Sequence, residues 1–187
     1  FYKKYTMKKL LLFLLFVPTL LFSQSYDWVN FPLIPSYQHN AGFGHSNSFS
    51  DDGSILAIGS YKHNLTFNNG NNFFNYGDEG IVSVFENISG VWTQIGVDIE
   101  GINPFDNFGF SVSLNSDGSI LAVGAKQETN NNYSSDGYVK IFQNISGTWT
   151  QIGNDIIGNT GARSGWSVSL SNDGSIVAVG EPYADNP

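Results

Sequence analysis

The sequence predicts an all-β fold, a β-propeller of four-stranded antiparallel blades with about two and a half repeats present. Three observations lead to this prediction. One stretch occurs three times, at residues 43–59, 108–125 and 164–180, and each copy carries a central Asp-Gly pair. A second segment, 87–101, recurs at 144–158 with 12 of 15 positions identical. Sparse charge (13%), abundant aromatic residues (15%) and 21 glycines suit strands joined by turns.

The inner half of a repeat is clearest from residue 108. Apolar residues alternate with Gly and Ser over 108–114, which is the period of a half-buried strand. The Asn-Ser-Asp-Gly sequence at 115–118 predicts a tight turn. The strand expected at 119–125 is apolar on both faces, as in a sheet covered on both sides.

The outer half follows a polar segment at 126–136, which we expect to be a loop. A third strand is expected at 137–143 and a fourth, more polar one at 148–156. Four antiparallel strands per repeat, with a buried second strand and a polar outer strand, describe a propeller blade.

The same register divides the whole chain. Residues 1–24 comprise upstream residues and a predicted signal peptide, and residues 25–187 form an incomplete propeller. Within the propeller we expect a closing fourth strand at 26–35, repeats at 41–101 and 106–158, and a partial repeat at 162–187. We expect a fragment of a longer protein, with self-assembly as the alternative.

The N-terminal segment 7–24 has a basic start, an apolar centre and a small residue near its end, as secretory signal peptides do. The apolar run at 10–22 is short for a membrane span, which needs about 20 residues. We expect cleavage next to Ser23 or Gln24 and no membrane span afterwards, with a retained anchor as the alternative. The prediction is a secreted or cell-surface protein of bacterial type without disulfides, since cysteine is absent.

The charge of the chain limits the classes of partner. The formal net charge is −8, and removal of 1–24 leaves four basic and sixteen acidic residues, or −12. Nucleic acids need a basic surface to neutralise their phosphates, so this balance argues against a nucleic-acid partner.

The repeat resembles the FG-GAP family, the repeat of the integrin α-subunit head. Phe43-Gly44 and Phe108-Gly109 match its Phe-Gly element, whereas the third repeat keeps only Gly165. Residues 80–85 and 137–142 look like its Gly-x-Val-x-Val-aromatic strand. The resemblance implies an extracellular propeller that binds ligands or partners, and it implies no reaction.

Many members of this family carry a calcium loop between the first two strands. Here each aligned turn offers one carboxylate, from Asp52, Asp117 or Asp173, beside neutral Ser or Asn residues. Calcium needs six to eight oxygen ligands, several of them carboxylates. These aspartates are therefore weak metal candidates, and we expect turns without calcium and no other cofactor.

Variable loops on a repeated scaffold are the usual place for binding. Phe73, Phe74 and Tyr76 lie in an Asn-rich segment, and Tyr133 lies in the corresponding segment of the next repeat. These aromatic side chains are candidates for stacking on a sugar, and the alternative is an ordinary solvated loop.

No set of nucleophile, acid and base stands out in the sequence. We therefore expect a non-enzymatic extracellular propeller that binds a protein or a glycan, as in adhesion. The alternatives are the propeller part of a secreted glycan-active enzyme and a structural spacer.

Overall fold

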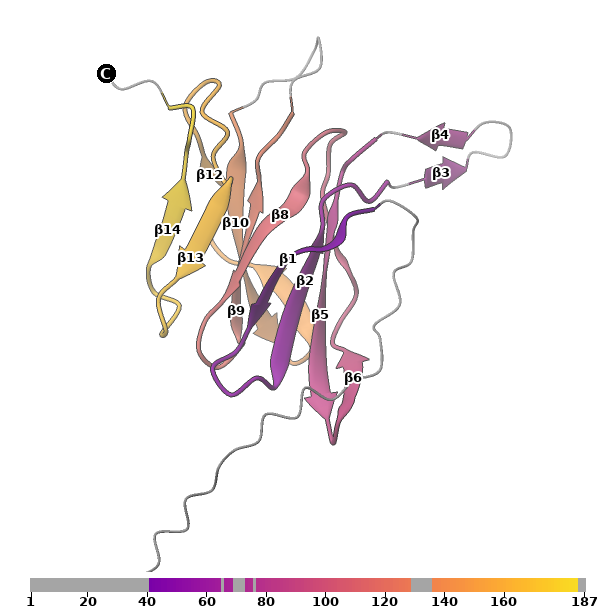
Figure 1. Ribbon diagram of the computed structural model, residues 1–187, viewed down its shortest axis with the longest axis vertical. Helices are drawn as coiled ribbons and strands as arrows, with labels where there is room; N and C mark the ends of the chain where they lie inside the picture. The colour runs from indigo at the N-terminus through magenta and orange to yellow at the C-terminus, as the bar shows by residue number, and fades with distance from the viewer. Residues whose placement is uncertain (1–40, 65, 69–72, 76, 129–135, 185–187) are drawn as a thin grey trace, which may run out of the picture. The chain divides into compact units, whose positions relative to one another are not determined.

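The computed structural model of the protein describes residues 41–64, 66–68, 73–75, 77–128 and 136–184 (Figure 1). These residues form strands, turns and loops, and all of them belong to one unit of the chain. The all-β, antiparallel prediction is confirmed for this part of the chain. The predicted signal peptide and the strand expected at 26–35 lie outside the described residues.

The first sheet contains five antiparallel strands in the order β1-β2-β5-β6, with β7 also paired to β5. Its strands are β1 (Phe43–Phe49), β2 (Ile55–Ser60), β5 (Ile81–Ile88), β6 (Val91–Gln94) and β7 (Ile99–Glu100). Strand β2 pairs on both sides, with β1 and β5, and its residues after Ile55 are buried.

The second sheet repeats this topology in the order β8-β9-β10-β11, with β12 paired to β10. Its strands are β8 (Phe108–Leu114), β9 (Ile120–Ala125), β10 (Tyr138–Ile145), β11 (Thr148–Gln151) and β12 (Ile156–Ile157). A two-stranded sheet follows, made of β13 (Ser167–Leu170) and β14 (Val177–Gly180).

The single fourth strand expected at 148–156 is wrong in detail, because it is divided into β11 and β12. Gly153, which lies between the two parts, has a φ of 73°, where the backbone departs from the extended conformation of a strand. The Asp155 carboxylate holds the break together by accepting hydrogen bonds from Gln151 Nε2 (2.7 Å) and Lys140 Nζ (2.8 Å).

The segment between β2 and β5, expected to be a loop, contains a further hairpin of β3 (Thr66–Asn68) and β4 (Phe73–Asn75). Thr66 pairs with Asn75, and Asn68 pairs with Phe73. The Asn-Gly pair at 69–70, between two Phe-containing runs, is a hairpin signal that the loop prediction overlooked.

The first two sheets pack face to face, and the main hydrophobic core lies between them. This core joins side chains of β2 and β5 to side chains of β8, β9 and β10. Its fully buried members are Ala57, Val82, Val84, Phe108, Leu121, Val123 and Ala125, with Val112, Leu114, Tyr138 and Phe142 nearly so. A smaller cluster of Leu56, Ile58 and Phe85 occupies the other face of the first sheet.

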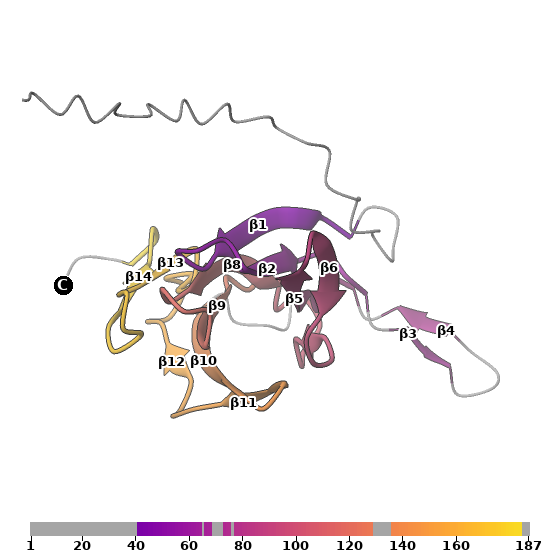
Figure 2. The same cartoon turned by 90° about the horizontal axis from the view of Figure 1, so that it is seen from below.

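Strand β8 contacts both β1 and β13, so the first strands of the three repeats lie side by side (Figure 2). Two equivalent hydrogen bonds join them. Ser46 Oγ donates to the Gly109 carbonyl oxygen, and Ser111 Oγ donates to the Gly165 carbonyl oxygen, both at 2.8 Å. The Ser-x-Ser sequences of β1 and β8 thus connect each of these strands to the next repeat.

The three Asp-Gly turns are also linked through their backbones. Asp51 N donates to Ser116 O (2.8 Å), and Ser116 N donates to Asn172 O (2.9 Å). The equivalent turns of neighbouring repeats therefore lie next to one another. Among the described residues, no helix is long and apolar enough to cross a membrane.

Candidate functional site

An aromatic ring follows the glycine at the opening of each repeat. These rings belong to His45, Phe110 and Trp166. The His45 and Phe110 ring centroids are 4.8 Å apart, and those of Phe110 and Trp166 are 5.2 Å apart. Equivalent positions of three repeats therefore form one continuous row of rings, tilted relative to one another by 45° and 56°.

Two tyrosines that follow the second strands extend this row of rings. Tyr61, just after β2, lies 4.5 Å from the His45 ring and 5.3 Å from the Phe110 ring. Tyr183, after β14, lies 6.0 Å from the Trp166 ring. We call the set His45, Tyr61, Phe110, Trp166 and Tyr183 the aromatic row.

A bulge in each of β1 and β8 places His45 and Phe110. Phe43 pairs with Ser60 and Ser46 pairs with Gly59, so Gly44 and His45 stand opposite no residue of β2. The same shift occurs between Phe108 and Ser111, around Gly109 and Phe110. Each bulge glycine adopts a φ of about 80° (81° at Gly44 and 79° at Gly109), which a residue with a Cβ rarely accepts. Bulges of this kind re-aim a side chain away from the ladder.

Lys126 lies against the middle of the row. Its Nζ is 4.4 Å from the centroid of the Phe110 ring and 5.3 Å from that of the Trp166 ring, within cation–π range. The residue is only 7% exposed, and Nζ forms an ion pair with Glu128 at 2.6 Å. A buried, ion-paired cation is therefore part of the packing of the row.

The row is open to solvent at both ends. Trp166 is 37% exposed and Tyr183 is 55% exposed, and His45 is also exposed, while Tyr61 and Phe110 are half-buried. Accessible aromatic rings in contact with one another can bind the apolar face of a sugar or another planar group.

Of the four aromatic candidates that the sequence predicts, two fall in a described strand. Phe73 and Phe74 belong to β4, where Phe74 pairs with Phe67 through the backbone. Tyr76 and Tyr133 are outside the described residues. Sugar binding by these four residues stays a prediction.

The weak metal candidates Asp52, Asp117 and Asp173 all lie in the Asp-Gly turns. Asp173 Oδ1 accepts hydrogen bonds from Ser171 Oγ (2.7 Å), Ser175 N (3.0 Å) and Ser175 Oγ (2.8 Å), and Asp52 repeats this arrangement with Ser50 and Ser54. These bonds lower the pKa of both carboxyl groups to about 2. Over the described residues, no three His, Asp or Glu side chains gather as a metal site.

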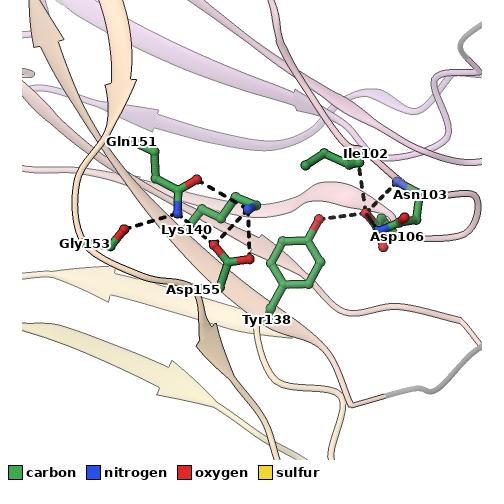
Figure 3. A network of polar contacts seen from close by, with 8 residues as sticks. All are labelled: Ile102, Asn103, Asp106, Tyr138, Lys140, Gln151, Gly153 and Asp155. Carbon is green, nitrogen blue, oxygen red and sulfur yellow. Dashed lines mark hydrogen bonds and ion pairs between the residues drawn. The ribbon is translucent and has the colours of Figure 1, made fainter.

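A cluster of polar side chains includes Asp106, Tyr138, Lys140 and Asp155 (Figure 3). The last three help to line a pocket of about 310 Å³. Asp106, 1% exposed, accepts hydrogen bonds from Tyr138 Oη (2.8 Å) and Gln127 Nε2 (3.0 Å). Three further donors are Ile102 N, Asn103 N and Asn103 Nδ2.

The electrostatics of this cluster favour a structural role. Burial and the neighbouring Asp106 charge raise the pKa of Tyr138, so its hydroxyl remains a donor. Burial alone would raise the pKa of Asp155, but hydrogen bonds from Lys140 and Gln151 outweigh it and lower the pKa. Both carboxylates are therefore occupied by protein donors.

The aromatic row was missed by the sequence reasoning, although a signal for it exists. The position between the opening Gly and the first Ser is His, Phe and Trp in the three repeats. Position-by-position comparison of the repeats would have identified this ring column. Its closing residues, Tyr61 and Tyr183, occupy non-equivalent positions and emerge only from the structure.

Comparison with known proteins adds no family to this description. No family model matches the sequence, and no curated protein matches it.

Proposed function

We propose that this chain is a non-enzymatic binding module of the cell surface or extracellular space, and that the aromatic row binds a glycan. The observation that carries the proposal is the contact of His45, Phe110 and Trp166 in the aromatic row, across three repeats. Sugar rings have an apolar face that stacks on aromatic side chains, and a row spanning three repeats suits an extended chain of sugars better than a single one.

We also propose that the repeats are blades of a β-propeller. Face-to-face sheets joined by equivalent serine–glycine bonds are what neighbouring propeller blades would need. The repeat residues quoted for the FG-GAP resemblance support it. A crystal structure of the whole protein with repeats around a common axis would support the propeller, and a two-layer sandwich would contradict it.

Export is proposed from the sequence of residues 7–24. The protein produced in a bacterium with its own N-terminus should appear outside the cytoplasm, shortened next to Ser23 or Gln24. Intact-mass measurement of the exported protein checks this. A cytoplasmic, uncleaved product would contradict the assignment.

The binding proposal is tested with a glycan array and the exported protein. Trp166→Ala should lower the affinity for the bound glycan about tenfold or more, since a stacking aromatic contributes about 1.5 kcal/mol. Ile176→Ala is the matched control, because Ile176 is 68% exposed in the same repeat and lies outside the row. Absence of binding to any glycan, or equal loss in both variants, would overturn the proposal.

A further inference from the structure

The cations of the chain are distributed unevenly over the described residues. The chain carries a net charge of −8, with sixteen acidic and eight basic residues. Four of the basic residues are described, namely Lys62, Lys126, Lys140 and Arg163. Three of these four lie against rings of the aromatic row, although the protein as a whole is acidic.

Each repeat contributes one of these cations. Lys62 Nζ is 5.5 Å from the centroid of the Tyr61 ring in the first repeat. Lys126 Nζ is 4.4 Å from that of Phe110 in the second. The Arg163 guanidinium carbon is 4.7 Å from that of Tyr183 in the third. Charge and aromatic surface therefore run together along the same three repeats.

The two outer cations differ from the central one in their partners. Lys126 forms an ion pair with Glu128. Lys140, which lies away from the row, forms an ion pair with Asp155. Within the described residues, Lys62 and Arg163 form no ion pair with a carboxylate. Lys62 is exposed and Arg163 half-buried, so their N–H groups are available to a ligand. A guanidinium of this kind binds carboxylate or sulfate oxygens with two parallel hydrogen bonds.

From this arrangement we infer that the ligand of the aromatic row is an anionic polysaccharide, whose sugar rings stack on Trp166 and Tyr183 and whose carboxylate or sulfate groups bind Lys62 and Arg163. The inference rests on the proposed function. The net negative charge of the protein repels polyanions in general, so binding of this class requires the local cations.

The test uses the exported protein and two pairs of polymers that differ only in charge. Dextran sulfate is compared with dextran, and polygalacturonate with its methyl ester, by isothermal titration calorimetry. We expect at least one charged polymer to bind, its uncharged counterpart to bind at least tenfold more weakly, and the affinity to fall between 50 and 500 mM NaCl. The two pairs show whether sulfate or carboxylate is preferred.

Three variants separate this inference from the proposed function. The double variant Lys62→Gln and Arg163→Gln should lower the affinity for the charged polymer at least tenfold and leave weak binding to its uncharged counterpart unchanged. Lys140→Gln, which removes the remaining described cation, should leave the affinity for the charged and for the uncharged polymer unchanged. Trp166→Ala should lower the affinity for both polymers. The thermal unfolding midpoint of each variant shows that it is folded.

The possible failures are distinguishable. Equal binding of charged and uncharged polymers, or an unchanged affinity in the double variant, overturns the anionic ligand and leaves glycan binding in place. Loss of affinity in Lys140→Gln as large as in the double variant also overturns it, because a general charge effect would then suffice. Absence of binding to all four polymers and to every glycan on an array overturns both.

Discussion

The hydroxyl of Ser111 donates a 2.8 Å hydrogen bond to the carbonyl oxygen of Gly165, 54 residues away in the next repeat. Ser46 and Gly109 form the same bond one repeat earlier. Gly165 is buried, so its carbonyl oxygen depends on this donor rather than on water. The connection between repeats thus rests on a short polar side chain facing a glycine with a positive φ, 79° at Gly109 and 81° at Gly165.

Ser111→Ala should therefore destabilise the protein by about 1–2 kcal/mol, because it leaves a buried carbonyl without its donor. Urea unfolding measures the change. Ser167→Ala is the matched control, since among the described residues the Ser167 hydroxyl donates to no following repeat. An equal cost for both variants would contradict the role assigned to Ser111.

Gly124→Ala tests how closely the repeats approach. A Cβ at residue 124 would collide with the Gly165 carbonyl oxygen and with Ser111 Oγ. Overpacking of this kind costs about 1–3 kcal/mol. At the equivalent Gly180, a Cβ would meet chiefly the Ser167 side chain, which can rotate. Thermal unfolding should therefore show a smaller loss for Gly180→Ala, and a reversed order would rule out close backbone packing at Gly124.

Tyr138→Phe should destabilise the second sheet by about 1.5–3 kcal/mol, because it removes a donor from the buried carboxylate of Asp106. Chemical denaturation provides the measurement. Tyr183→Phe, at a side chain that is 55% exposed, should change stability by less than about 0.5 kcal/mol. A Tyr138→Phe protein as stable as the control would show that Asp106 does not need this bond.

The Asp-Gly turns predict a loss of stability in acid. In the folded protein the pKa of Asp52 and Asp173 is lowered from 3.8 to about 2 by hydrogen bonds from neighbouring serines and backbone N–H groups. A carboxyl group with a lowered folded pKa stabilises the fold above its unfolded pKa, and this stability disappears as the pH falls through its folded pKa.

We therefore expect the urea midpoint to fall between about pH 4 and pH 2. The double variant Asp52→Asn and Asp173→Asn should show a shallower decline over the same interval. Asp51→Asn is a control in the same turn as Asp52. Identical pH profiles for the wild type and the double variant would refute the contribution of these turns.

Calcium should leave the thermal midpoint unchanged at millimolar concentration. The Oδ1 atoms of Asp52 and Asp173 each accept three hydrogen bonds, from two serine hydroxyl groups and one serine backbone N–H. In addition, each turn supplies fewer carboxylates than a calcium ion requires. Differential scanning calorimetry with calcium and with a chelator makes the comparison. A calcium-dependent rise in the midpoint that Asp117→Ala abolishes would reinstate the metal site.

Sequence periodicity predicts the first strand of the repeat, because apolar residues alternate with Gly and Ser in β8 and a one-residue slip would turn Val112 and Leu114 to the wrong face. The second strands β2 and β9 are apolar on both faces, so a short continuous apolar run predicts them instead. Asp-Gly turns add a second local constraint. The break between β11 and β12 was not predicted, because it depends on Gly153 and on Asp155 meeting Lys140 from a neighbouring strand.

The aromatic row separates what the sequence determines from what the tertiary structure decides. Repetition of the opening Gly-ring-Ser pattern determines that each repeat carries a ring at one position. Only the packing of β1, β8 and β13 side by side brings those rings to 4.8–5.2 Å spacings and places Lys126 against Phe110 and Trp166. The fold also brings Tyr61 and Tyr183, with Lys62 and Arg163 against their rings, to the same row. Net charge is additive along a chain, whereas local charge depends on which distant residues the fold gathers on one surface.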